Sequence, residues 1–263
     1  MISPMLCKPV KVLPHDDNYI YEFKADGGRV LAYIKQGRVK ILTRQGNIVG
    51  SKFPEITAKL SKLPDCVLDG EIVVFNDGKT DFKLYQKRVM LENPFKIKLL
   101  SKSIPATFIV FDIIQLGDVD LKYYTLMERK STLAKVIGNG LNDCIKPIIY
   151  YKSPHFLLEK RHLIEGIVAK RKDSIYEAGK RSGAWIKYRF IKEDVVVAVK
   201  YEETPSGIVA IDEQGHRITV NGRQAEAVKR AIDENGKVEL EIDYMEKTEG
   251  GRYRFPAFRR VVK

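Results

Sequence analysis

The stretch YIYEFKADGGRVLAYI, residues 19–34, places two runs of strand-forming residues on either side of a charged turn that contains glycine. Lys24 stands at the end of the first predicted strand, directly before Ala25, Asp26 and two glycines. Burial and neighbouring cations both lower a lysine pKa, so such a placement can make the amine a nucleophile, and the glycines would let the backbone pass close to a phosphate. Taken alone, the stretch fits a hairpin turn with incidental charges better.

The composition is that of a soluble globular protein with one large domain or two ordinary ones. The chain has 263 residues, of which 44% are hydrophobic and 30% charged. Three widely spaced cysteines favour a reducing compartment and provide no paired ligands for a structural zinc ion. No apolar run is long enough for a membrane-spanning helix and no signal peptide is recognisable, so we expect a cytoplasmic or nucleoid-associated protein that does not contact membranes.

The positive charge is distributed unevenly along the chain. The net charge is +12, yet residues 191–263 carry 13 Lys and Arg against 14 Asp and Glu, so the excess lies in residues 1–190. This asymmetry suggests a basic N-terminal domain that faces a polyanion, most commonly nucleic acid. A basic surface that serves only solubility explains the charge equally well.

The pattern of predicted helices and strands changes near residue 190. Before it, β-rich segments mix with helical patterns without strict alternation, which predicts an α+β domain of antiparallel sheets with helices over residues 1–190. Helices are expected at residues 54–63, 82–90 and 125–137, the last beginning with a capping box of Thr125 and Glu128. After it, about five short strands and one helix predict a small OB-type β-barrel at residues 191–263.

Charged residues recur on strands that otherwise look buried. Asp69 and Glu71 alternate in LDGEIVVF, residues 68–75, and therefore point to one face. EGIVAKR, residues 165–171, and WIKYR, residues 185–189, carry further acids and cations in strand patterns. Acids on an inner sheet face are costly unless they are paired or bind metal, so these segments together predict a pocket for a triphosphate and a divalent metal.

In this order, the segments resemble the motifs of the covalent nucleotidyltransferases, the superfamily of ATP-dependent DNA ligases, RNA ligases and mRNA capping enzymes. The matching segments are KxDGxR at 24–29, TRxG at 43–46, DGE at 69–71, the aromatic Phe111, EGxVxK at 165–170 and a KxK-like motif at 187–189. Residues 174–189 and 249–261 resemble DNA ligases in particular. In the last motif Arg189 replaces lysine, which keeps the charge but cannot give up a proton.

The resemblance implies a ligase adenylation domain, ATP-grasp-like, followed by the OB-fold domain, with the active site in the cleft between them. It also implies that Lys24 attacks the α-phosphate of ATP, forms a lysyl-AMP and passes the AMP to the 5′-phosphate of a DNA nick. The 3′-hydroxyl then closes the strand. The expected substrate is nicked double-stranded DNA, and the expected state is a monomer that needs no protein partner.

The same resemblance assigns roles to single residues. Lys24, Arg29, Glu71 and Lys187 are the implied catalytic residues. Glu71 and Glu165 would bind Mg²⁺, for which Mn²⁺ can substitute. The implied nucleotide-binding residues are Glu22, Lys24, Arg29, Arg44, Glu71, Phe111, Val168, Lys170, Lys187 and Arg189. The implied DNA-binding residues are Arg29, Arg44, Lys83, Lys87 and Arg88.

Individual contacts follow from these roles. Glu22 would read the adenine amino group, while Phe111 and Val168 would flank the base. Lys170 and Lys187 would hold the α-phosphate and lower the pKa of Lys24.

Two other functions remain open from the sequence. One is an RNA ligase or an RNA-capping type of nucleotidyltransferase, which would differ in the nucleotide and the strand that react. The other is a non-catalytic DNA-binding protein with a ligase-like core. The presence of Lys24, Glu71, Glu165 and Lys187 argues against the second.

Overall fold

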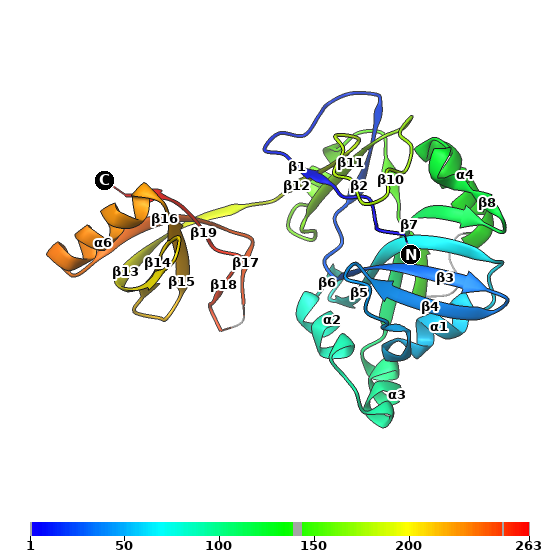
Figure 1. Ribbon diagram of the computed structural model, residues 1–263, viewed down its shortest axis with the longest axis horizontal. Coiled ribbons are helices and arrows are strands. Elements are labelled where there is room, and N and C mark those ends of the chain that lie inside the picture. Colours follow the sequence, from blue (N-terminus) through cyan, green and yellow to red (C-terminus); the bar gives the residue numbers. More distant parts are fainter. Residues whose placement is uncertain (1, 139–143, 249, 263) are drawn as a thin grey trace. The chain divides into compact units, whose positions relative to one another are not determined.

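The computed structural model describes residues 2–138, 144–248 and 250–262 (Figure 1). The chain divides into two compact units, Met1–Tyr188 and Arg189–Lys263, and each has its own hydrophobic core. None of the described helices is long and apolar enough to cross a membrane.

The first unit contains two sheets. In the β5 sheet the strand order is β4-β3-β5-β7-β8, with β6 paired to β5 and β9 to β7. Its strands are β3 (Gly28–Lys35), β4 (Arg38–Thr43), β5 (Cys66–Asn76), β6 (Lys79–Thr80), β7 (Ala106–Leu116), β8 (Val119–Asp120) and β9 (Ile145–Pro147). In the β2 sheet the order is β1-β12-β11-β2-β10. Its strands are β1 (Lys8–Pro9), β2 (Tyr19–Phe23), β10 (Tyr150–Tyr151), β11 (Gly166–Arg171) and β12 (Trp185–Arg189).

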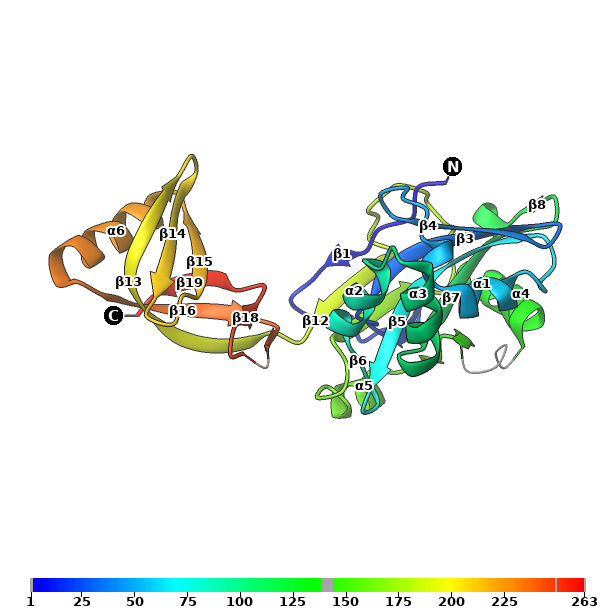
Figure 2. The ribbon, with the colours of Figure 1, turned by 90° about the horizontal axis from the view of Figure 1, so that it is seen from below.

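Helices cover one face of the β5 sheet, and the β2 sheet lies on its other face (Figures 1 and 2). These helices are α1 (Pro54–Leu60), α2 (Phe82–Val89), α3 (Pro94–Ser103) and α4 (Leu126–Ile137), with short 3₁₀ turns at Gly50–Lys52 and Leu121–Tyr123. A further helix, α5 (His155–Glu159), lies beside the β2 sheet, where Phe156 stacks on Tyr151 of β10 at 4.9 Å. The helices expected near residues 54, 82 and 125 are confirmed, as is the capping box of Thr125 and Glu128. α3 had not been expected as a helix.

Alternation along the strands decides which side chains enter the space between the sheets. On β3, Val30, Ala32 and Ile34 pack into the core under the helices, whereas Leu31 packs between the sheets. Arg29 lies two residues before Leu31 and therefore points to the same face of β3. On β5, Asp69 and Glu71 lie two and four residues after Val67 and therefore point to the same face. Val67 also packs between the sheets. The charged residues of both strands are therefore directed toward the β2 sheet.

The second unit contains an antiparallel sheet in the order β15-β14-β13-β16-β19, whose two edge strands also contact each other, and a separate pair of strands, β17 and β18. Its elements are β13 (Lys192–Thr204), β14 (Gly207–Asp212), β15 (Arg217–Asn221), α6 (Arg223–Asn235), β16 (Val238–Tyr244), β17 (Glu246–Lys247), β18 (Tyr253–Arg254) and β19 (Ala257–Val261). α6 places Ala225, Val228 and Ile232 in the core of this curled sheet. The predicted α+β class and the small barrel with one helix are confirmed.

Candidate active site

Lys24 directly follows β2 and begins the turn into β3. Its backbone N–H donates to the carbonyl of Gly166 at 2.8 Å, which ties the turn to the start of β11. The glycines of the turn leave room for close packing: a Cβ on Gly27 would lie 2.1 Å from the Ile72 carbonyl oxygen, and one on Gly28 would lie 1.7 Å from the Tyr85 hydroxyl. In this structure the glycines therefore allow the turn to pack closely against β5 and α2. The sequence suggests instead that they let the backbone approach a phosphate.

The Lys24 ammonium forms an ion pair with Glu165, the residue immediately before β11. The Lys24 side chain is 21% exposed and the Glu165 side chain 7%, so the pair lies at the surface of an otherwise buried site. The ion pair holds the Lys24 nitrogen against the Glu165 carboxylate, so the pair must separate before the amine can act as a nucleophile.

Glu71 lies in the same group of charges. It is the register partner of Arg29 across β3 and β5. Burial raises the pKa of Glu71 to about 7, against the opposing charges of Lys24 and Arg29 and with the support of Glu165 and Asp26. Glu71 and Glu165 are thus two carboxylates whose charges interact, with cations beside them. Carboxylate oxygens are ligands that Mg²⁺ prefers. Lys24, Arg29, Glu71 and Glu165 thus lie in one group of charges.

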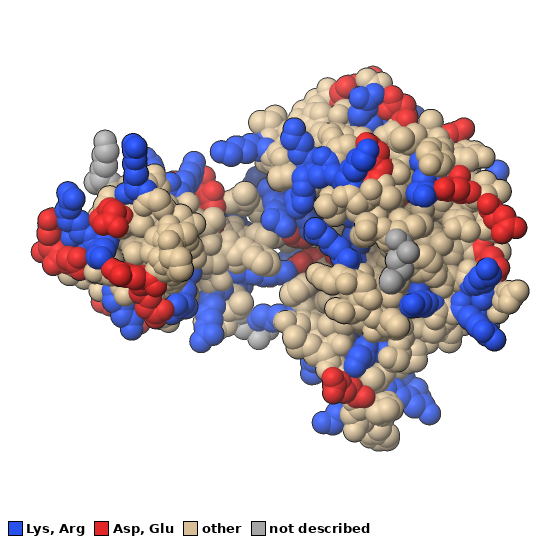
Figure 3. Space-filling view, in the orientation of Figure 1, with Lys and Arg blue, Asp and Glu red and all other residues tan. Residues whose placement is uncertain are grey.

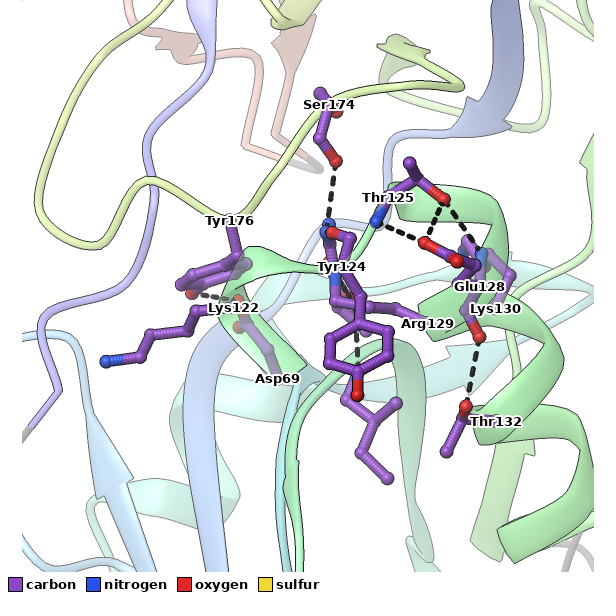
Figure 4. Close-up of polar contacts among 12 residues, drawn as sticks. Asp69, Lys122, Tyr124, Thr125, Glu128, Arg129, Lys130, Thr132, Ser174 and Tyr176 are labelled. Atoms are coloured by element: carbon purple, nitrogen blue, oxygen red, sulfur yellow. Dashed lines mark hydrogen bonds and ion pairs between the residues drawn. The ribbon is translucent and has the colours of Figure 1, made fainter. Parts of the chain in front are cut away.

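Asp69 holds Arg29 in a fixed orientation. Arg29 Nε donates to Asp69 Oδ1 at 3.0 Å and Nη2 donates to Oδ2 at 2.7 Å, while the Tyr176 hydroxyl donates to Oδ2 at 2.6 Å (Figure 4 shows the Tyr176 contact). Burial lowers the pKa of Arg29, but the charge and hydrogen bonds of Asp69 outweigh it and leave that pKa raised. The guanidinium also lies 5.2 Å from the Phe111 ring centroid and 5.7 Å from that of Trp185.

Glu22 forms a second, fully buried group of charges. Its Oε1 pairs with the Lys130 ammonium of α4, and its Oε2 lies 2.7 Å from Lys170 Nζ on β11. Lys170 Nζ lies 4.3 Å from the Phe111 ring centroid and 4.1 Å from that of Trp185. Lys170, together with Arg29 over the same rings, connects this group to the Lys24 group.

The two residues expected to flank adenine differ in their surroundings. Val168 is half-buried and is the register partner of Glu22 across β2 and β11. Phe111 is also half-buried, but it is not an open platform, because Lys170 and Arg29 lie over its ring and Trp185 packs edge-on at 6.0 Å.

The remaining predicted nucleotide ligands lie at the margins. Lys187 is half-buried on β12, and its charge, with those of Arg29, Lys170 and Lys24, lowers the pKa of Cys7, although burial raises it more. Lys187 lies two residues after Trp185 on the same strand and so on the same face, and Arg29 and Lys170 lie over the Trp185 ring. Arg189 is exposed at the end of β12. Arg44 is exposed in the turn that follows β4. This turn starts close to Arg29, because Thr43, the last residue of β4, pairs with Val30 on β3.

The structure contradicts one predicted DNA contact. Lys83 and Lys87 on α2 are exposed as expected, but Arg88 is completely buried. Its Nη1 pairs with Glu55 Oε1 at 2.8 Å and donates to the Ile104 carbonyl at 2.5 Å, and its Nη2 donates to the Lys52 carbonyl at 3.0 Å. Arg88 therefore joins α1, α2 and α3 and is not available to DNA.

Sequence reasoning missed Lys130, and it gave Asp69 and Tyr176 no role in fixing Arg29. The sequence did contain a signal for Lys130. In α4, Leu126, Leu133 and Ile137 form the buried stripe, and Arg129 and Lys130 fall within it at helical spacing. Two cations inside an apolar stripe indicate buried acidic partners.

Comparisons with known proteins identify the family of the chain. The family described as ATP dependent DNA ligase domain matches residues 4–189. The SPbeta prophage-derived DNA ligase-like protein LigB of Bacillus subtilis (strain 168) is 30% identical over 98% of this chain and 97% of its own length. DNA ligase C of Mycobacterium tuberculosis (strain ATCC 25618 / H37Rv) is 28% identical over 79% of this chain, which spans 60% of that protein.

A solved structure shows the same fold. The mycobacterial DNA ligase D complexed with ATP and MES superposes with a TM-score of 0.64 at 22% identity, over 99% of this chain and 95% of that one. The family match covers well over half of the chain and contains every element of the Lys24 group. The chain therefore belongs to the ATP-dependent DNA ligase family.

Proposed function

We propose that this chain is an ATP-dependent DNA ligase that seals nicks bearing a 5′-phosphate and a 3′-hydroxyl, with Lys24 as the covalent nucleophile. The observation that carries the proposal is the group formed by Lys24, Glu165, Glu71 and Arg29 within the family-matched region. It joins Lys24, at the surface of the site, to Glu71 and Arg29 on strands and to Glu165 at the start of a strand. Catalytic groups held by sheets keep the geometry that transfer at phosphorus requires.

The first step is nucleophilic substitution at the α-phosphate of ATP. The deprotonated Lys24 amine forms an N–P bond, the bond to the bridging oxygen of pyrophosphate breaks, and pyrophosphate leaves with that electron pair. Before attack the Lys24 ammonium gives up a proton, which Glu165 or water accepts, and separates from Glu165, because only the free amine has the electron pair that forms the N–P bond. A second proton passes from the nitrogen to solvent once that bond has formed.

A divalent metal held by Glu71 and Glu165 would neutralise charge on the phosphates. Both residues supply carboxylate oxygens, the ligand type that Mg²⁺ takes, and Mn²⁺ accepts the same donors. Binding a cation there would also favour the ionised form of Glu71, whose pKa is otherwise raised to about 7. Occupation of Glu165 by the metal would weaken its hold on Lys24.

Recognition of the nucleotide would use the second group of charges. Glu22 would accept from the adenine amino group, and Phe111 and Val168 would flank the base. Lys170, Lys187 and Arg189 would hold the α-phosphate. Because Lys170 now pairs with Glu22, this assignment requires Lys170 to turn toward the phosphate when the nucleotide binds.

The proposed substrate is nicked double-stranded DNA, sealed by a monomer in the cytoplasm or at the nucleoid. Arg29 and Arg44 would hold the nick phosphate, and Lys83 and Lys87 would contact the backbone. On the face drawn in Figure 3, Lys and Arg gather over the region of β1, β2 and β12 in the first unit. Such a cluster supports binding of a polyanion.

The test is formation of a covalent adduct. Incubation with ATP and Mg²⁺ should add the mass of one AMP, and nicked DNA should then be joined. Lys24→Ala should abolish both, whereas Lys62→Ala, which removes an exposed lysine elsewhere, should leave both intact. An adduct that persists in Lys24→Ala would refute the assignment. Joining of nicked RNA, or an adduct with GTP alone, would instead indicate an RNA ligase or a capping enzyme.

A further inference from the structure

Lys130 is a buried cation to which none of the sequence motifs assigns a role. Its side chain is 5% exposed, and its ammonium pairs with Oε1 of Glu22, whose side chain is 2% exposed. Burial lowers the pKa of Lys130, and the charge of Glu22 opposes that effect. A lysine is seldom buried without a paired acid, so the contact with Glu22 accounts for its presence there.

The other partner of Glu22 has a competing task. Lys170 lies 2.7 Å from Glu22 Oε2, so a single carboxylate faces two ammonium groups in the interior. If Lys170 turns to a phosphate, Glu22 loses one of them while it remains buried. A buried carboxylate that loses every cationic partner is costly and is no longer held in one orientation. Lys130 is placed so that Glu22 keeps a counter-charge.

The position of Lys130 is set by α4 and does not depend on a ligand. The helix begins at the Thr125–Glu128 capping box (Figure 4). The adjacent Arg129 is held by Asp112 at 2.8 and 2.9 Å and donates to the carbonyls of Tyr124 and Ser174. Lys130 thus projects from a firmly anchored helical turn, whereas Lys170 is shared between Glu22 and two aromatic rings.

We propose that Lys130 is a positioning residue that holds the Glu22 carboxylate oriented toward the base, and thereby sets the preference for adenine over guanine. The inference rests on the proposed function, in which Glu22 faces the base. A carboxylate held in this orientation accepts from the exocyclic amino group of adenine but repels the carbonyl oxygen that guanine carries at the equivalent position. Without Lys130 the carboxylate can turn away from the base, so loss of Lys130 should weaken the discrimination.

The experiment measures covalent adduct formation with ATP and with GTP, which the adduct mass distinguishes. In Lys130→Met the ratio of kcat/KM for ATP to that for GTP should fall by about tenfold or more, since a mispaired buried hydrogen-bonding group costs at least that much. Lys130→Arg keeps the charge and should change the ratio by less than about threefold. Leu133→Ala, a buried change on the same helix, should leave the ratio unchanged.

A double-mutant cycle separates positioning from general damage to the fold. Glu22→Gln and the combined Glu22→Gln, Lys130→Met variant should share one nucleotide preference, because Lys130 acts through Glu22. The combined variant removes one charge of each sign and remains informative if Lys130→Met alone does not fold. An unchanged ratio in folded Lys130→Met, or different preferences in the two Glu22→Gln backgrounds, would overturn the inference. Absence of any adduct in the unmodified protein would instead refute the proposed function.

Discussion

Glu71 is the residue whose protonation should shape the pH response of the ligand-free protein. Its pKa is raised from 4.5 to about 7, so between these pH values the folded state binds more protons than the unfolded state. The free energy of unfolding should therefore fall as pH rises through this window.

Glu71→Gln removes that dependence. In urea unfolding with EDTA and without nucleotide, the variant should be more stable than the unmodified protein by about 1–3 kcal/mol at pH 7.5, and the difference should shrink toward pH 4.5. Parallel pH profiles for the two proteins would contradict the assigned pKa.

Asp69 should contribute to stability more than its position in a DGE motif suggests. Its side chain is fully buried and accepts from both Arg29 and Tyr176. Asp69→Asn leaves the Arg29 charge without its counter-ion and should cost about 2–4 kcal/mol in chemical denaturation. Tyr176→Phe removes a single hydrogen bond and should cost about 1 kcal/mol. Equal losses in the two variants would show that the charge pair is not the dominant contribution.

At the scale of elements, α2 carries two adjacent cations with different tasks. Arg88 is buried against Glu55 and the end of α3, whereas Lys87 is exposed on the same helix. Arg88→Met should lower the free energy of unfolding by about 3 kcal/mol, because Glu55 and two backbone carbonyls lose their partner. Lys87→Ala should change stability by less than about 0.5 kcal/mol and should weaken DNA binding instead. A stable Arg88→Met protein with impaired DNA binding would restore the surface role that the structure contradicts.

The elements also show what periodicity alone can predict. α1, α2 and α4 were predictable because Pro54, the apolar face of α2 and the Thr125 capping box are local signals. α3 was missed because lysines alternate with apolar residues in FKIKLL, residues 95–100, as in a strand. Asn93 nevertheless caps it by accepting from the Lys96 N–H at 3.1 Å, and Pro94 provides its first residue. The Asn93 cap and Pro94 therefore favour a helix here, although the alternating lysines resemble a strand pattern.

The candidate site was predictable to a different degree. The motifs predicted one group of Lys24, Arg29, Glu71 and Glu165 because each stands on a strand or directly beside a strand end. Partners from distant parts of the chain could not be predicted, since Lys130 is 108 residues from Glu22 and Tyr176 is 107 residues from Asp69. The burial of Arg88 likewise depends on carbonyls at the end of α3, a helix that had not been expected.

For the whole molecule, the charge asymmetry should decide how DNA is bound. The second unit is close to neutral, so the excess positive charge lies in the first, where Lys83 and Lys87 are exposed. Neutralised phosphates release counterions, so the logarithm of the association constant should fall linearly with the logarithm of salt concentration, by about 0.9 per contact.

This dependence separates lysines that contact DNA from those that only confer solubility. Titrations of nicked duplex at increasing NaCl should give a slope whose magnitude drops by about 1 in Lys83→Ala and in Lys87→Ala. Lys62→Ala, an exposed lysine on the loop after α1, serves as the matched control and should reproduce the unmodified slope. If all three variants share one slope, α2 does not contact the DNA backbone, and the positive charge of this helix serves only the solvated surface.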